Sequence, residues 1–385
     1  MTNEGNASSK FNKHMKIGIL TYPLNNNYGC YLQSYALLHF LQENGYDVEY
    51  IMRRHDKPSW KFYIKYAIKN IANNIVSLKW KYPFYDYEWH YMVRRGGDLL
   101  PFYEHYIAPH TQPIYTTKSL SKVCSRYDVI IVGSDQVWRA EILSNITDYF
   151  LCFDKDDRIV KIAYAASFGK DSPGYTPFQK RLCGKSLSRF KAVSVRETIG
   201  LKLMKDYGWS CPDAEVVLDP TMLLFKNDYL SLIKTRDEPP IVFAYILDQT
   251  EEKISILKKV AERLSLNEYN ILKEFDSNAF VYPSVEKWLS CYASASFIVT
   301  DSFHGTVFAI LFNVPFVVVI NEKRGSARFE TLLDTFKLKD RVVSTEDDLD
   351  ELFHAPIEWN SVNDILRLKR EESKKFILKN VATNE

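Results

Sequence analysis

Four groups of polar residues in this sequence follow short apolar runs, where they could bind an anion or move a proton. The most informative group is Ser302, His304 and Gly305, which follows the run FIVT at 297–300. Ser302 is a suitable N-cap for a helix over 301–313. Free N–H groups at a helix N-terminus attract phosphate or carboxylate, and a histidine there can hold an anion or transfer a proton. The alternative is a histidine that only caps or packs.

The same stretch has the pattern of a β-α-β unit. Pro315 would end the helix, and the apolar run at 316–320 would form the next buried strand. Open sheets of parallel strands bind ligands at the carboxyl ends of their strands. His304 is predicted at such an edge, and Gly305 lets a ligand approach the backbone, so a functional role is favoured over simple packing.

The other three groups have the same predicted position at the carboxyl end of a strand. They are Asn27, Tyr28 and Gly29 after 15–21; Gly133, Ser134, Asp135 and Gln136 after 128–132; and Arg196 and Glu197 after 192–195. Arg196 could bind a carboxylate or phosphate through two parallel hydrogen bonds, or form a salt bridge to Glu197 or another acid. Asp135 could act as a base toward a sugar hydroxyl, or cap a helix.

Two further charged stretches could belong to a binding site or could simply be solvated surface loops. Lys323, Arg324 and Arg328 follow the strand after the His304 helix and could complete an anion site, but each could equally belong to a solvated basic loop. Asp154 and Asp156 form a DxD pattern, which is more typical of an acidic surface turn than of a metal site. No metal site is therefore predicted.

Composition and charge limit the class of protein. The chain has 385 residues, which favours two domains, and its net charge of +2 gives no reason to expect nucleic acid as a partner. The six cysteines include no CxxC pair, as expected in a reducing cytoplasm without a zinc site. A polar N-terminal stretch and the lack of a run of roughly 20 apolar residues predict neither a signal peptide nor a membrane span.

The order of elements predicts an α/β fold with two Rossmann-like domains that face each other across a cleft. The expected segments are a disordered tail over 1–14, an N-terminal domain over 15–228, a C-terminal domain over 229–345, and a helical tail over 346–385 that packs back toward the N-terminal domain. The loop after the first strand has neither GxGxxG nor GxxxxGK[ST], so the usual dinucleotide and triphosphate cradles are not expected.

A basic, aromatic insertion is predicted over 53–112. Within it, residues 57–82 combine apolar side chains at helical spacing with six lysines and no acid. The apolar positions are Trp60, Ile64, Ile68, Ile71, Ile75 and Leu78, and the lysines are Lys57, Lys61, Lys65, Lys69, Lys79 and Lys81. This pattern fits a helix that lies on an anionic membrane, and it fits equally a core-packed helix with a basic outer face.

Five motifs together resemble the polysaccharide pyruvyl transferase family. They are NYGCYLQSYAL at 27–37, VIIVGSDQVW at 129–138, SVRE at 194–197, LDPTMLL at 218–224 and TDSFHGTVFAILFNVPFVVV at 300–319. The resemblance implies a fold like that of GT-B glycosyltransferases, phosphoenolpyruvate as donor, and a pair of saccharide hydroxyls as acceptor. It also implies that the N-terminal domain is the acceptor side and the C-terminal domain the donor side. The product would be a pyruvate ketal, with phosphate released and no cofactor or metal required.

The resemblance also implies roles for individual residues. His304 matches the catalytic histidine of the family and Arg196 a donor-binding arginine. One departure is that many members have an arginine where this chain has Ser302, so Arg324 or Arg328 could supply the charge. The full expected site is His304 and Asp135 for catalysis; Arg196, Ser302, Gly305, Lys323, Arg324 and Arg328 for the donor; and Asn27, Tyr28, Gln33, Ser134 and Gln136 for the acceptor.

The expected acceptor is a glycan precursor linked to polyprenyl diphosphate, as used in capsule and exopolysaccharide synthesis. The expected location is the cytoplasm, with peripheral contact to the inner face of the membrane. Two alternatives are a nucleotide-sugar glycosyltransferase of GT-B type and a non-catalytic glycan-binding relative.

Overall fold

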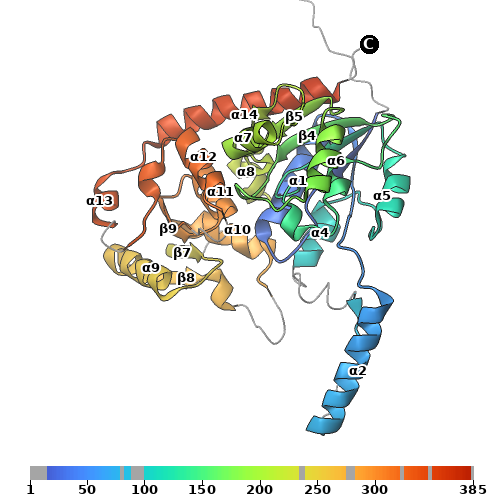
Figure 1. Cartoon of the computed structure of the whole chain (residues 1–385). Coiled ribbons are helices and arrows are strands. Elements are labelled where there is room, and N and C mark those ends of the chain that lie inside the picture. Colours follow the sequence, from blue (N-terminus) through green and yellow to red (C-terminus); the bar gives the residue numbers. More distant parts are fainter. Residues whose placement is uncertain are drawn as a thin grey trace, which may run out of the picture.

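The computed structural model describes residues 15–78, 82–87, 99–233, 239–274, 282–320, 325–345 and 349–382. Two separate sheets of parallel strands organise these residues, with helices around them (Figure 1). The predicted tail over 1–14 lies outside the described residues, as do Lys79, Lys81, Lys323 and Arg324.

The first sheet has the strand order β2-β1-β3-β4-β5-β6, and every pairing is parallel. Its strands are β1 (Lys16–Leu20), β2 (Asp47–Tyr50), β3 (Val129–Val132), β4 (Val160–Ala166), β5 (Ala192–Val195) and β6 (Glu215–Val216). The helices of this part are α1 (Tyr28–Glu43), α2 (Trp60–Ser77), α4 (Leu100–Tyr106), α5 (Thr117–Cys124), α6 (Pro177–Leu187) and α7 (Thr198–Asp206). Strand β3, with the sequence VIIV, is buried throughout, as expected for a strand covered on both faces.

The second sheet has the order β10-β9-β7-β8, also parallel. Its strands are β7 (Ile241–Tyr245), β8 (Asn267–Asn270), β9 (Ala295–Thr300) and β10 (Phe316–Val318). The helices are α8 (Lys226–Leu230), α9 (Glu251–Leu264), α10 (Val285–Ser294), α11 (Phe303–Phe312), α12 (Ala327–Thr335) and α13 (Leu349–His354). Strand β8 is followed directly by a 3-10 turn over Ile271–Glu274.

The β-α-β unit around His304 is confirmed. Ser302 caps α11 by accepting a hydrogen bond from the N–H of Gly305, and Asn313 ends the helix in a left-handed conformation with φ of 56°. Every residue of α11 is buried, which explains why its sequence is apolar on all sides. The helix is therefore held rigidly, and His304 in its first turn has a fixed place.

Helix α14 (Trp359–Val381) follows the second sheet in sequence but packs on the first (Figure 1). The buried guanidinium of Arg370 donates from Nε to the carbonyl of Met222 at 2.7 Å and from Nη2 to that of Leu224 at 3.0 Å. The hydroxyl of Ser373 accepts a hydrogen bond from the N–H of Leu218 at 3.0 Å. These contacts fix residues 218–224, which lead to the candidate site described below.

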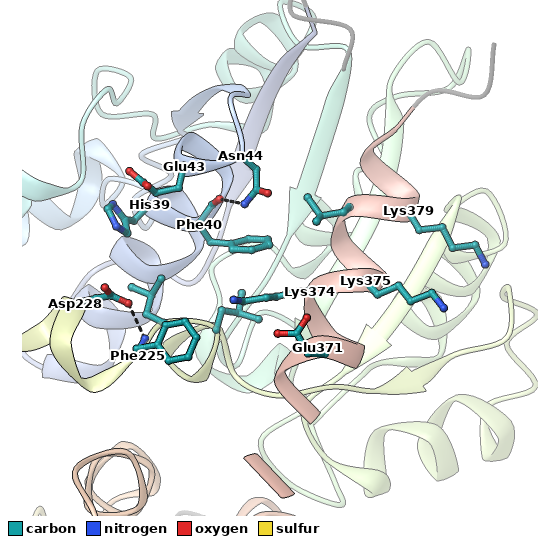
Figure 2. Close-up of a pocket in the computed structure, with 13 residues that line it drawn as sticks. His39, Phe40, Glu43, Asn44, Phe225, Asp228, Glu371, Lys374, Lys375 and Lys379 are labelled. Carbon is teal, nitrogen blue, oxygen red and sulfur yellow. Dashed lines mark hydrogen bonds between the residues drawn. The ribbon is translucent and has the colours of Figure 1, made fainter. Parts of the chain in front are cut away.

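A surface pocket of about 570 Å³ lies between α1, α14 and residues 223–228 (Figure 2). The ammonium of Lys374 lies 5.0 Å from the ring of Phe225 and 5.8 Å from that of Phe40, so it bridges the two walls. Acidic Glu43, Asp228 and Glu371 share the pocket with the lysines of α14. We interpret this pocket as the seam where α14 meets the first domain.

Arg370 is expected to be a main attachment of α14. Replacing it by leucine removes two charge-assisted hydrogen bonds and leaves two carbonyls without a donor, so the free energy of unfolding should fall by about 2–4 kcal/mol. Urea denaturation measures this change. Arg367→Leu, on the exposed side of the same helix, should change the free energy of unfolding by less than about 1 kcal/mol; equal effects of the two substitutions would contradict the assignment.

Candidate functional site

Each sheet has one point where its connections turn in opposite directions: between β1 and β3 in the first, and between β7 and β9 in the second. Crevices at such points are the usual ligand sites of open parallel sheets. The loop after β3 carries Ser134 and Asp135, and the turn after β9 carries Ser302 and His304. The two sheets therefore present their expected binding edges through residues that the sequence analysis selected.

The N-terminal turns of α1 and α11 touch each other at Gly29 and His304. A β-carbon placed on Gly29 would lie 1.9 Å from Nδ1 of His304, which is far closer than any real contact. Only glycine at this position leaves room for the imidazole ring. Gly29 belongs to the first domain and His304 to the second, so their contact joins the two edges into one site.

The carboxylate of Asp219 is the centre of the site. Its Oδ2 lies 2.6 Å from Nη1 of Arg196 and 3.6 Å from Nε2 of His304, and it accepts a hydrogen bond from the hydroxyl of Ser134 at 3.1 Å. Its Oδ1 accepts hydrogen bonds from the N–H and the hydroxyl of Thr221 at 3.0 and 2.7 Å. Asp219 thus contacts a basic side chain from each domain while its own position is fixed.

Asp135 binds the second terminal nitrogen of the Arg196 guanidinium, the one that does not contact Asp219. Nη2 of Arg196 donates to Oδ1 of Asp135 at 3.1 Å, and the thiol of Cys30 donates to Oδ2 at 3.2 Å. Asp135 has φ of 65°, the left-handed conformation that aspartate tolerates better than most residues. Arg196 is therefore fixed between two carboxylates, the salt-bridge alternative raised by the sequence.

Burial and charge shift the pKa values of this cluster in a consistent direction. Burial favours the neutral acid, but the charges of His304 and Arg196 outweigh it and hold the pKa of Asp219 well below its usual range. Burial also opposes ionisation of Asp135, yet Arg196, His304 and Arg328 together lower its pKa. Both aspartates are therefore carboxylates at neutral pH.

Arg328 adds a second guanidinium to the site. Its central carbon lies 5.9 Å from the ring of Phe303, and that of Arg196 lies 4.4 Å from the same ring. Burial, together with repulsion from Arg196, lowers the pKa of Arg328 to about 10. Two buried cations that repel each other would both gain from an anionic ligand.

Two cavities are lined by residues of both domains, and Glu330 of α12 lines both of them. Residues of the cluster line the smaller one. The smaller, of about 350 Å³, is lined by Arg196, Asp219, Phe303 and Thr331 among others. The larger, of about 1080 Å³, runs from Lys170 and Ile199 of the first domain to Asp248, Lys253 and Ser326 of the second. In the lining of the smaller cavity, the backbone N–H of Thr198 in the first domain donates to the hydroxyl of Thr331 in the second at 3.2 Å.

Several of the predicted residues come together. His304, Asp135, Ser134 and Arg196 form the cluster, Arg328 lies beside it, and Ser302 and Gly305 shape the turn that holds His304. Asn27 caps α1 by accepting a hydrogen bond from the N–H of Gly29 at 2.9 Å. Lys323 and Arg324 lie outside the described residues.

Three residues expected to bind the acceptor have other contacts. The hydroxyl of Tyr28 donates to the carbonyl of Pro283, and its ring stacks on Trp288, so this side chain fills the domain interface. Gln33 is fully buried and donates to Thr21, whose hydroxyl donates to the carbonyl of Ser134. Gln136 accepts a hydrogen bond from Arg139 at 2.9 Å. Tyr28 and Gln33 therefore hold the backbone around the site in place.

Asp219 is the residue that the sequence analysis did not select. It stands in the LDPTM run directly after β6, at the same carboxyl edge as the residues that were selected. That position was the available signal. What the sequence lacked was the identity of its partners, because Arg196 and His304 belong to distant parts of the chain.

Comparison with solved structures agrees with the architecture. UDP-GlcNAc 2-epimerase from Neisseria meningitidis, bound to UDP-GlcNAc, is 12% identical with a TM-score of 0.52, covering 96% of this chain and 100% of that one. Another UDP-N-acetylglucosamine 2-epimerase is 10% identical with a TM-score of 0.51, covering 94% of both chains. At these identities the likeness establishes the fold alone, and the predicted GT-B-like pair of Rossmann-like domains is confirmed. A search of curated proteins finds no match.

The sequence itself defines the protein more narrowly than the fold. Residues 27–323 match the polysaccharide pyruvyl transferase family, which is most of the chain. The protein belongs to that family, as the five motifs predicted. Membership supports a transferase that acts in polysaccharide synthesis.

The contact between Gly29 and His304 predicts an unusual mutational pattern. Gly29→Ala should destabilise the protein by about 1–3 kcal/mol, because the added methyl group has no space beside the imidazole. In a His304→Ala background the same substitution should be neutral or stabilising, since alanine is the better helix former. Denaturation of the two single variants and the double variant measures the coupling; additive effects would show that the two residues do not touch.

Asp219 is expected to stabilise the fold in a pH-dependent way. Because its pKa is lowered by folding, its contribution is complete above the ordinary value of 3.8 and is lost as the pH falls below it. Asp219→Asn should cost about 3–5 kcal/mol in the free energy of unfolding at pH 7, and the difference from wild type should shrink in acid. Asp364→Asn, which breaks an exposed pair with Arg367, is the matched control and should have little effect at either pH.

Proposed function

We propose that this protein transfers pyruvate from phosphoenolpyruvate to a saccharide, forming a pyruvate ketal and releasing phosphate. The observation that carries the proposal is the buried cluster in which His304 from one domain meets Asp219 and Arg196 from the other. It combines a group that can transfer a proton with cations that can hold a multiply charged donor, in a chain that belongs to the pyruvyl transferase family.

The donor is assigned to the smaller cavity and the turn before α11. Arg196 and Phe303 line that cavity, and Arg328 lies against the same phenylalanine ring. The carboxylate and phosphate of phosphoenolpyruvate would relieve the repulsion between the two guanidiniums. Arg328 then supplies the charge that many family members place at the position of Ser302.

The saccharide is assigned to the larger cavity. Its volume of about 1080 Å³ has room for a sugar unit, and its described lining holds more acids than bases. The acids are Asp171, Asp248, Glu252 and Glu330, and the bases are Lys170 and Lys253. Such a lining favours neutral hydroxyl groups over the highly charged donor.

The reaction can be written so that every proton is accounted for. His304 donates a proton to C3 of phosphoenolpyruvate, which leaves a cation at C2 stabilised by its oxygen. One sugar hydroxyl adds to C2 and loses its proton to the unprotonated His304, either directly or through Asp135, which restores the histidine to its starting form. The bond from C2 to the phosphate oxygen then breaks, with the electron pair leaving on phosphate, and a second hydroxyl adds to C2 and gives its proton to phosphate. No metal ion or cofactor takes part in this scheme.

The acceptor we propose is a glycan precursor on polyprenyl diphosphate at the inner face of the cytoplasmic membrane. In the described ranges of the chain no helix is both long and apolar enough to cross a bilayer. An enzyme for such an acceptor would therefore work from the membrane surface.

The direct test measures phosphate release from phosphoenolpyruvate in the presence of candidate acceptors, and identifies the ketal by mass spectrometry. Transfer from a sugar nucleotide without use of phosphoenolpyruvate would instead establish the glycosyltransferase alternative. Glycan binding without turnover of either donor would establish the non-catalytic alternative.

His304→Ala should lower the rate of phosphate release by at least about 100-fold, because general acid catalysis by a positioned group contributes on the order of 10²–10⁴-fold. Its circular dichroism and oligomeric state should match those of the wild type. His354→Ala, at the end of α13 in the second domain, is the matched control and should retain full activity. A folded His304→Ala protein with near wild-type turnover would refute the assignment.

A further inference from the structure

Helix α2 stands out from the body of the molecule (Figure 1). It has 18 residues, of which Asn74 is the one that is buried. The core-packing alternative required the isoleucine stripe to be covered, and it is not: Trp60, Ile64, Ile68, Ile71 and Ile75 are between 38% and 68% exposed. The sequence pattern fitted both alternatives, and the exposure of these side chains now excludes packing of the isoleucine stripe in the core.

The side of α2 that is covered carries different residues. Tyr63 and Tyr66 pack edge-on against Tyr85, with ring centroids 5.9 and 5.0 Å apart. On the same side Asn70 donates to the carbonyl of Pro83 at 3.5 Å. The chain after the helix thus returns along the tyrosine and asparagine side and leaves the isoleucine stripe open.

A row of lysines borders the open stripe. Lys61, Lys65 and Lys69 each follow a residue of the stripe, so they lie about 100° around the helix from it. All three are exposed, and α2 contains no acidic residue. The surface of α2 therefore combines an apolar row with an adjoining cationic row, both facing solvent.

The base of α2 is fixed to the domain that carries the site. Arg53, buried just before the helix, pairs with Asp148 at 2.8 Å and with Asp56 at 2.6 Å. Arg53 also bridges to Ile114 in the parallel sense. The segment leaves the first sheet after the carboxyl end of β2, the edge at which Ser134, Asp135 and Arg196 lie.

We propose that α2 docks the protein on an anionic lipid bilayer, with its isoleucine stripe in the interface and its lysines against lipid head groups. A second copy of this chain is a poorer occupant, because pairing two stripes would bring two lysine rows together without a carboxylate on α2 to neutralise them. An anionic leaflet matches both rows, and Trp60 suits the boundary between head groups and acyl chains. The inference rests on the proposed function only for the identity of the acceptor.

The experiment is co-sedimentation of the full chain with phosphatidylcholine vesicles, with and without phosphatidylglycerol. Binding is expected only to the anionic vesicles. It should be strong at about 0.01 M salt and lost at about 1 M, since the Debye length falls from about 30 Å to about 3 Å. Brominated lipids should quench part of the tryptophan fluorescence, and Trp60→Phe should remove that part.

Two sets of variants separate the contributions of the rows. Replacing Lys61, Lys65 and Lys69 by glutamate should weaken vesicle binding more than about tenfold. Replacing Ile64 and Ile68 by serine should also weaken it, and the binding that remains should be lost at a lower salt concentration than that of the wild type. The matched control replaces Lys185, Lys202 and Lys205, exposed on the body, by glutamate and should retain binding.

Three results would overturn the proposal. They are a wild-type protein that ignores anionic vesicles at low salt, a control triple that loses binding as completely as the α2 triple, and sedimentation velocity that shows dimers dissociated by the isoleucine substitutions. The proposed reaction is tested separately, by phosphate release with a short soluble acceptor. If the reaction is correct, all the α2 variants should release phosphate with this acceptor at the wild-type rate, and if it is wrong, the wild type should release none.

Discussion

The structure depends on neutralising a set of charges that are almost completely buried. Asp135, Asp219 and Glu197 are buried with Arg196, and the second domain adds His304 and Arg328. Taking an ion out of water costs several kcal/mol unless partners and hydrogen bonds compensate. The first domain alone would hold three carboxylates against one guanidinium, so docking of the second domain brings a second guanidinium, that of Arg328, to the cluster. The same charges that could act on a substrate therefore also hold the domains together.

This arrangement links positioning and chemistry. Arg196 is held by two carboxylates and by the ring of Phe303, so it has little freedom to follow a ligand. Glu197 is held as well, because its Oε1 accepts the N–H of Phe168 at 2.9 Å and that of Gly169 at 3.4 Å. Rigid polar groups suit the stabilisation of a charge that develops during reaction, because they need not reorganise when it appears.

Much of the fold could be predicted from the sequence because buried parallel strands consist of short continuous runs of apolar residues. The runs that became β1, β3, β5 and β9 were visible, and the polar residues after them marked the site edge. Burial was harder to predict: Tyr28 and Gln33 stand in a motif that indicated binding, but their partners Pro283 and Thr21 could be known only from the packed structure. Asp219 was missed for the same reason.

Helix α2 shows that helical spacing of apolar residues does not reveal what their side of the helix contacts. An isoleucine every three or four residues gives one apolar side whether that side meets a core or a bilayer, and the pattern was identical for both. The structure distinguishes the two alternatives. The side of α2 that the rest of the chain covers carries Tyr63, Tyr66 and Asn74, so the isoleucine side is the one left exposed. A polar side turned inward and an apolar side turned outward is a reversal that composition alone does not reveal.

Helix α14 has a consequence for how the protein is made. The ribosome synthesises the first domain, then the whole second domain, and only then the residues of α14 that donate to the carbonyls of Met222 and Leu224 and accept from the N–H of Leu218. Until Arg370 and Ser373 emerge, the segment that holds Asp219 lacks these partners. A nascent chain can therefore form its first sheet early, but it cannot finish that domain during synthesis of the second, and the site matures last of all.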